Sequence, residues 1–418
     1  MDGTIAVAGL RTRGHPAALA AARAIVEAGA THALLLAGPA GVGKTTLALD
    51  LAAVLLCSGA TGLERPCRAC RGCRMVDSGN HPDLHRLAPD GPGGQIRIGE
   101  RSNADPGTVR RLVSDLALLP VEGGARVAIV EGAHRMNDDA QSALLKTLEE
   151  PAAGITIVLC ADEEERLLPT IRSRCARIRL GTLDVREIEA ILGEQAAADP
   201  PTAARLGRLA GGRPGIALAY ARAPDAVLAR TEIARSLLDL LDASRARRLA
   251  AVRELLASAA IVAGNLAEAG APRAGDADGP AGRARRSRRV VGPPVRPAAA
   301  ADSAASSVDP GGEGAVEPAE SGRRAPAAER RRAAGQLIEI WREVARDLAV
   351  VRLGQPGQVR DTALLDDLAA AAEGLDPAAA PRFLVRLARA GELLDVNVGP
   401  ELLVDDLVIA WRPRGAAA

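Results

Sequence analysis

A glycine-rich segment with a lysine and a threonine is the first part of the sequence whose residue types could do chemistry. It runs from Gly38 to Thr45 and matches the phosphate-binding pattern G-x-x-x-x-G-K-[ST]. The glycines let backbone N–H groups converge on phosphate oxygens, and Lys44 would reach the β- and γ-phosphates while Thr45 holds Mg²⁺. We therefore expect ATP with Mg²⁺ here. The predicted binding residues are Gly38, Pro39, Ala40, Gly41, Val42, Gly43, Lys44, Thr45, Thr46 and, from a later strand, Glu131.

The acidic pair that ATP hydrolysis requires is only half present. The apolar run Val127–Val130 predicts a buried strand, and Glu131 directly after it can serve the metal ion. The next position, where nucleotide-driven motors usually carry the acid that activates water, is Gly132, which has no side chain. The sequence therefore predicts nucleotide binding with impaired cleavage.

Four cysteines lie close together in the spacing C-x9-C-x2-C-x2-C, namely Cys57, Cys67, Cys70 and Cys73. Their thiolates can close a tetrahedral shell around Zn²⁺, and a closed shell is structural rather than catalytic. His81 is an alternative fourth ligand, and four free buried thiols are the alternative without metal. The surrounding arginines form either a solvated face or a contact with DNA or a partner: Arg65, Arg68, Arg71 and Arg74.

The elements that must position these residues alternate along the first part of the chain. Apolar runs at 33–37, 127–130 and 155–160 predict buried strands, and helical patterns at 45–56 and 138–150 separate them. Strands separated by helices indicate a parallel sheet covered on both faces. The P-loop then follows the first strand and opens a helix, which is the context that this motif requires.

The rest of the chain changes character. Residues 182–225 are helical only, and long amphipathic helices follow over 226–266 and 333–413. Between these two stretches, 267–332 is dominated by Gly, Pro, Ala, Ser and Arg, so we expect it to be a disordered insertion.

Composition excludes several classes of protein. The 418 residues carry 53 basic and 52 acidic side chains, and the net charge of +1 does not fit a polybasic DNA coat. Aromatic residues make up 1% of the chain, which argues against a base-stacking binder of single strands. A signal-peptide pattern and a long apolar run are both lacking, so we expect a cytoplasmic protein without a membrane partner.

An arginine that could act outside its own subunit follows the third predicted strand, in Ser173-Arg174-Cys175. Displayed there, Arg174 can reach a γ-phosphate held by a neighbour, as an arginine finger. The order of P-loop, acidic strand end, helix, strand and Ser-Arg-Cys resembles the clamp-loader subunits of bacterial DNA polymerase III, which belong to the AAA+ superfamily. Further matching pieces are Gly14-His15, His81-Pro82-Asp83, the stretch 143–151 and Thr170–Cys175.

The resemblance implies an α/β P-loop AAA+ domain over 1–181, with a zinc module at 57–73. An all-α lid over 182–225 and an all-α oligomerisation (collar) domain over 226–266 and 333–413 would follow. It also implies partners: gamma/tau-type and delta-type subunits in a hetero-oligomeric ring, primer-template DNA through the assembled complex, and the sliding clamp indirectly.

Within that family, the resemblance favours the delta-prime type, an assembly subunit that has lost hydrolysis and would donate Arg174 in trans. Gly132, Asp162 and Gly215 stand where motors carry a catalytic Glu, a hydroxyl or amide sensor and a second-sensor Arg. The alternative is an active ATP-hydrolysing motor of the gamma/tau type. A zinc-dependent nucleic-acid module beside an unrelated P-loop enzyme is disfavoured by the net charge and the scarcity of aromatics.

Overall fold

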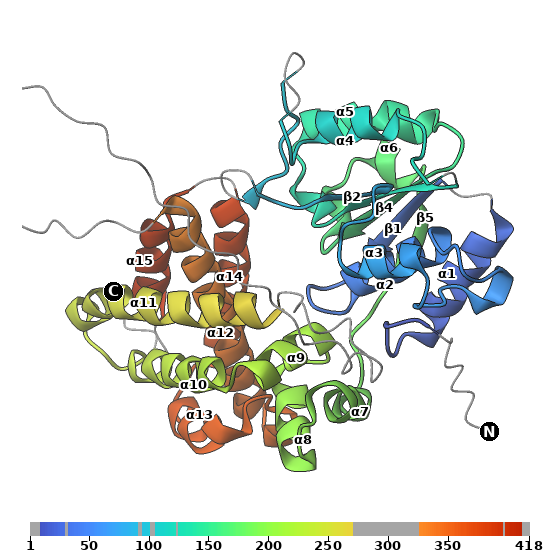
Figure 1. Cartoon of the computed structure of the whole chain (residues 1–418). Helices are drawn as coiled ribbons and strands as arrows, with labels where there is room; N and C mark the ends of the chain where they lie inside the picture. Colours follow the sequence, from blue (N-terminus) through green and yellow to red (C-terminus); the bar gives the residue numbers. More distant parts are fainter. Residues whose placement is uncertain are drawn as a thin grey trace, which may run out of the picture.

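The structure, a computed structural model, contains an α/β domain next to a larger helical region (Figure 1). It describes residues 9–29, 32–90, 94–100, 105–122, 124–270, 326–395 and 398–411.

A five-stranded parallel sheet forms the centre of the α/β domain. Its strands are β1 (Ala33–Ala37), β2 (Leu84–Leu87), β3 (Arg126–Val130), β4 (Ile155–Ala161) and β5 (Ala176–Arg179). They lie in the order β2-β3-β4-β1-β5. The three predicted strands are thus present as β1, β3 and β4, and the two outer strands are additional. Because all strands are parallel, the residues that follow β1, β3 and β4 meet at one edge of the sheet.

Helices cover both faces of the sheet, as the sequence predicted (Figure 1). Alternate residues of each strand face opposite layers, so Leu34 and Leu36 pack with one set of helices and Leu35 with the other. The first layer is α1 (Pro16–Ala28), α2 (Lys44–Leu55) and α3 (Arg71–Asp77). The second layer is α4 (Val109–Leu116), α5 (Asp138–Glu149) and α6 (Pro169–Arg172).

Three helices form the lid: α7 (Val185–Ala196), α8 (Pro200–Leu209) and α9 (Pro214–Arg222). Helix α7 begins with a capping box, in which the Asp184 side chain accepts from the Glu187 backbone and the Glu187 side chain accepts in return. The lid has its own apolar core, centred on Ile188, Leu192 and Leu206.

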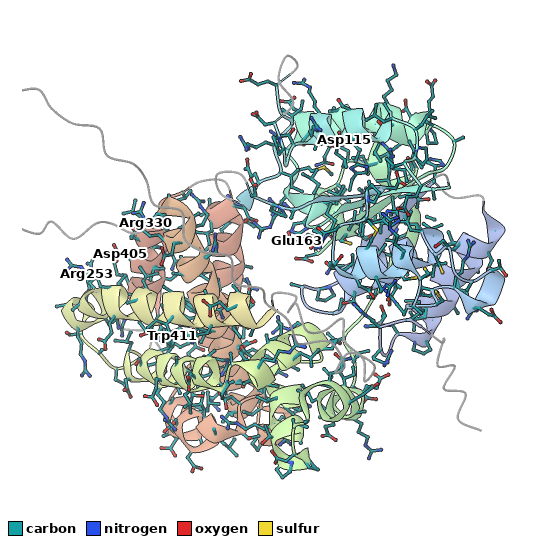
Figure 2. The ribbon with its side chains drawn as sticks, in the orientation of Figure 1. Asp115, Glu163, Arg253, Arg330, Asp405 and Trp411 are labelled. Atoms are coloured by element: carbon teal, nitrogen blue, oxygen red, sulfur yellow. The ribbon has the colours of Figure 1, made fainter. Side chains whose placement is uncertain are left out.

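The collar is a helical bundle with a single apolar core. Its helices are α10 (Pro224–Asp239), α11 (Arg245–Gly270), α12 (Ala327–Arg352), α13 (Leu365–Ala372), α14 (Ala379–Asp395) and α15 (Pro400–Ala410). Three of the chain's few aromatic residues meet there, because the rings of Trp341, Phe383 and Trp411 all contact one another (Trp411 is labelled in Figure 2). Helices α11 and α12 pack together, so the two predicted collar pieces form one bundle.

The predicted disordered insertion is shorter at both ends than the sequence suggested. Helix α11 continues to Gly270 and α12 begins at Ala327, so the prediction of disorder was wrong for 267–270 and 327–332. The remainder, 271–325, lies outside the described residues. Short 3-10 helices complete the described chain: Gly62–Glu64, Ala133–Arg135, Glu164–Arg166, Pro356–Gln358 and Thr362–Leu364.

Helix α11 is long and apolar enough to cross a membrane, by length and composition alone. It packs against α10, α12 and α15, with Leu255, Ala259 and Val262 in the collar core. Of its apolar stretch 22% is buried, and that part is the face that packs on the collar core.

Candidate nucleotide site and cysteine cluster

Lys44 stands at the first turn of α2, where the P-loop delivers it. The loop leaves β1 at Gly38 and enters the helix at Gly43, whose φ of 105° lies in the left-handed region. The Lys44 ammonium donates to the carbonyl oxygens of Gly38 and Pro39, both at 2.6 Å. It also forms an ion pair of 2.7 Å with Asp162, and only 7% of the Lys44 side chain is exposed.

The two predicted metal-serving residues lie side by side. Thr45, on α2, donates from Oγ1 to Glu131 Oε2 at 3.5 Å. The other oxygen of Glu131 accepts from Arg86 of β2, at 2.6 Å. A hydroxyl beside a carboxylate at the mouth of a P-loop suits Mg²⁺, which prefers oxygen ligands.

The residue after Glu131 is Gly132, and its surroundings leave little room for a side chain. Gly132 has a φ of 59°, a conformation that side-chain-bearing residues rarely adopt. A Cβ atom added there would lie 2.9 Å from the Pro89 ring. The local backbone is therefore built around glycine, and no water-activating carboxylate occupies this position.

Asp162 joins the site from the end of β4. Its backbone N–H donates to Nδ1 of His134 at 3.1 Å, which leaves the proton of the neutral ring on Nε2, 3.9 Å from the Asp162 carboxylate. Burial lowers the pKa of His134 to about 4, so the ring is neutral at physiological pH. Sequence reasoning noted the position of Asp162 but did not foresee its pairing with Lys44. The signal available was an acidic residue directly after a buried strand.

The lid contacts the P-loop through the start of α9. The Gly215 N–H donates to the carbonyl of Gly41 at 2.8 Å, and Ile216 lies against Gly41 so closely that a Cβ there would be 2.8 Å from its side chain. Arg213, the nearest arginine to the second-sensor position, forms an ion pair of 2.9 Å with Glu343 of the collar. The cavity next to Gly43 and Thr46 measures about 90 Å³, well below the roughly 300–1,000 Å³ typical of ligand pockets.

Arg174 lies at the other edge of the sheet from its own P-loop. Ala176 pairs with Leu34 near the start of β1, whereas the P-loop follows the end of that strand. The Arg174 side chain is at the surface, where it pairs with Glu149 at 2.7 Å and donates to the Thr170 carbonyl at 3.0 Å. Within its own chain, Arg174 therefore does not join the nucleotide site.

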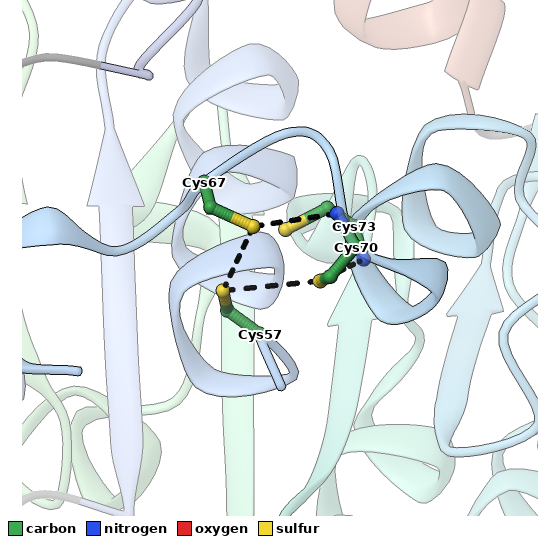
Figure 3. Close-up of side chains that lie close together, drawn as sticks. All are labelled: Cys57, Cys67, Cys70 and Cys73. Atoms are coloured by element: carbon green, nitrogen blue, oxygen red, sulfur yellow. Dashed lines mark hydrogen bonds between the residues drawn. The ribbon is translucent and has the colours of Figure 1, made fainter. Parts of the chain in front are cut away.

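The four cysteines converge into a cluster that could hold a metal ion (Figure 3). Their sulfur atoms all lie within 4.8 Å of one another, and Cys57 Sγ is 3.6 Å from Cys67 Sγ and 3.9 Å from Cys70 Sγ. Tetrahedral Zn–S bonds of the usual length separate sulfurs by about 3.8 Å. Although burial opposes it, N–H donors from Cys73 and Ser58 lower the pKa of the Cys70 thiol to about 5, which favours the thiolate.

His81 is engaged elsewhere. Its Nδ1 accepts from the Asp83 backbone at 3.1 Å, and its Nε2 faces Glu122 at 3.7 Å. The described residues thus gather four thiols, without His81, as the ligand set.

The arginines around the cluster differ from one another. Arg68 forms ion pairs with the buried Asp50 and, at 2.6 Å, with Asp77, so it ties α2 to α3. Arg65 donates to the Ala60 carbonyl at 2.8 Å. Two of the four therefore stabilise the local fold and do not form an open basic face.

The fold and this site define the class of protein. A parallel sheet in the order β2-β3-β4-β1-β5, a P-loop after β1, an acidic residue after β3 and a helical lid over the loop are those of an AAA+ P-loop domain. The predicted fold class is confirmed.

Comparisons with known proteins narrow the class. A family model described as DNA polymerase III, delta subunit, matches residues 15–184. A DNA polymerase III subunit delta′ of Pseudomonas aeruginosa is 40% identical over 151 residues, which are 35% of this chain and 42% of the relative. A DNA polymerase III subunit tau of Salmonella typhimurium is 35% identical over 180 residues, 42% of this chain and 26% of the relative.

Among solved structures, a gamma-subunit-related protein of Thermotoga maritima is similar over 93% of this chain and 97% of its own, at 14% identity and a TM-score of 0.37, a likeness too distant to assign a role. The chain spans about half the length of the curated delta′ relatives it matches. Over residues 15–184 the chain is similar to subunits of DNA polymerase III, as its motifs indicated.

Proposed function

We propose that this protein is a delta-prime-type subunit of the DNA polymerase III clamp loader. It binds neighbouring subunits of the gamma/tau and delta types in a ring, and the ring loads the sliding clamp on primer-template DNA. It acts in the cytoplasm. Relatives named delta′ and tau both support such a hetero-oligomer.

The observation that carries the non-hydrolysing role is Gly132. A catalytic Glu at this position would have to adopt a left-handed backbone with its Cβ 2.9 Å from the Pro89 ring, so the missing acid could be gained only with a local shift of the backbone or of Pro89. The Arg213 guanidinium is also engaged by Glu343, at 2.9 Å. The gamma/tau-type motor is the alternative, and the intact P-loop is the feature that favours it.

Arg174 supports the role in trans. Its place at the opposite edge from its own P-loop suits a guanidinium that serves a neighbour, and its partial exposure leaves it free to exchange Glu149 for a phosphate. An arginine finger stabilises the charge that develops on the transferred phosphoryl group.

We further propose that the four cysteines hold a structural Zn²⁺. Four thiols with no open position suit a closed tetrahedral shell, which supplies stability and no catalysis. The ligands would be Cys57, Cys67, Cys70 and Cys73, which join the end of α2 to α3.

The test is ATP turnover by the purified chain and by the complex with gamma/tau-type and delta-type subunits. The chain alone should release no more phosphate than its Lys44→Ala variant. Arg174→Ala should assemble normally and lower turnover by the complex, because one site loses its finger. The matched control is Arg179→Ala, an exposed arginine at the other end of β5. Lys44-dependent turnover by the chain alone would establish the motor instead.

A further inference from the structure

We propose that Asp162 occupies, from within the chain, the place on Lys44 that the terminal phosphates of ATP require, and so sets the affinity of this P-loop for nucleotide. The inference rests on the P-loop being a nucleotide site, as proposed above. It assigns to Asp162 a role that neither the motif nor the missing catalytic acid accounts for.

Lys44 has a limited hydrogen-bonding capacity. An ammonium group has three N–H donors. All three are used inside the chain, by the carbonyls of Gly38 and Pro39 at 2.6 Å and by Asp162 at 2.7 Å. A phosphate can bind Lys44 only by displacing one of these acceptors, and Asp162 is the one whose negative charge matches its own.

The backbone holds Asp162 in this place. Its neighbour Ala161 pairs with Ala37 at the end of β1, and the Ala161 carbonyl accepts from Gly38 N–H at 3.2 Å. The Asp162 N–H is fixed by His134. A carboxylate anchored one residue beyond the sheet is a preorganised partner for Lys44 and not a chance contact between two long surface side chains.

The ion pair between Lys44 and Asp162 can be broken. Asp162 is 35% exposed, so its carboxylate can turn to water when a phosphate arrives, whereas Lys44 remains buried. Exchange then costs the charge-assisted hydrogen bond and leaves two like charges near each other. Asp162 thus weakens nucleotide binding without abolishing it.

A role for Asp162 as a Mg²⁺ ligand predicts the opposite sign. The oxygens suited to the metal are those of Thr45 and Glu131, which lie 3.5 Å apart. Asp162 contacts the ammonium instead. Removing its charge should strengthen ATP binding if it competes with phosphate, and weaken it if it serves the metal.

The experiment is calorimetric titration of the full chain with ATP and Mg²⁺. Asp162→Asn should lower Kd by about 10- to 100-fold, the size of one charge-assisted hydrogen bond. Glu163→Gln is the matched control, because Glu163 (labelled in Figure 2) is the next carboxylate, is 58% exposed and pairs with Arg166 at 3.8 Å. Its Kd should equal that of the parent. In a Lys44→Ala background, Asp162→Asn should bring no gain.

Three results would overturn the inference: equal Kd in parent and Asp162→Asn, weaker binding in Asp162→Asn, or a gain that persists without Lys44. Asp162→Ala, with circular dichroism on each variant, separates loss of charge from loss of fold. Association with a gamma/tau-type subunit is measured on the same proteins by size-exclusion chromatography. Normal association without the affinity gain overturns this inference alone, and failure of the parent to associate overturns the proposed function.

Discussion

Two ion-paired regions of this molecule are built from similar groups and do different work. The lid–collar joint consists of Arg213, Arg230, Glu343 and Asp361. Arg230 is 1% exposed and pairs with Glu343 at 2.7 Å and with Asp361 at 2.6 Å. At the P-loop, by contrast, Lys44 pairs with an aspartate that water can reach.

The difference lies in how many partners each charge has and in whether water can replace them. Glu343 accepts from both Arg213 and Arg230, so the joint links the lid to two collar helices. Although burial opposes it, the charges of Glu343 and Asp361 raise the pKa of Arg230, so this charge persists in the folded protein. A buried network is costly to break by removing one partner, whereas a half-exposed pair exchanges readily. The joint therefore fixes the lid, and the P-loop pair yields to a ligand.

The largest expected effect follows from breaking the joint. Arg230→Ala leaves two buried carboxylates without their shared partner, and it should lower the free energy of unfolding by about 3–5 kcal/mol. Arg235→Ala is the control, because Arg235 is 47% exposed and pairs with Glu232 and Asp367; it should cost less than about 1 kcal/mol. Both tryptophans lie in the collar core, so their fluorescence in a urea titration reports this region. Equal midpoints for the two variants would mean that the joint does not hold the collar.

The next largest effect concerns the cysteine cluster. With metal bound, the cluster should stabilise the α/β domain about as strongly as the lid–collar joint stabilises the collar. Zinc at about a hundred times its Kd should stabilise this domain by about 3 kcal/mol, because metal binds only the folded ligand set. Differential scanning calorimetry with and without chelator measures the shift. Cys70→Ser should abolish it. Cys175→Ser, which lies outside the cluster, should not. An unchanged transition on chelation would refute the structural-zinc proposal.

Sequence reasoning found the parts of the α/β domain whose signal is local. The P-loop, Glu131 and the four cysteines are defined by spacing within a few residues and by the strand before them, and the structure brings each group together. Ion pairs between distant segments have no such signal. Arg213 and Glu343 are 130 residues apart in the sequence, and Lys44 meets Asp162 only because β1 and β4 are neighbours.

The two strands that the sequence analysis missed have a related cause. Both β2 and β5 lie at the edges of the sheet and are four residues long. An edge strand buries only part of its surface, so Leu84–Leu87 and Ala176–Arg179 carry arginines and lack the continuous apolar run of the central strands. Edge strands are therefore the part of a parallel sheet that apolar patterning detects least well.

The smallest expected effect is a loss of stability of the P-loop region in mild acid, with the lid–collar joint unaffected. The pKa of His134 falls from 6.5 to about 4 on folding, because burial disfavours the charged ring. A lowered histidine pKa means that the unfolded chain binds the proton first. The stabilisation is then fully present above pH 6.5 and is lost as the pH falls toward 4. Between pH 6.5 and about 5 the loss should be about 2 kcal/mol.

His134→Asn isolates this contribution, because its amide oxygen can still accept from the Asp162 N–H while the side chain no longer titrates. Urea titrations followed by circular dichroism should show a steeper loss of stability in the parent than in the variant over this pH range. Tryptophan fluorescence, which reports the collar, should show the same pH dependence in both proteins, because the arginines of the joint stay charged throughout. Parallel circular dichroism profiles would show that the neutral state of His134 does not contribute to stability. A difference seen equally by both probes would instead mean that the α/β domain and the collar unfold as one unit. The P-loop pair and the lid–collar joint would then differ in how easily a ligand replaces a partner, and not in the stability of the domains that contain them.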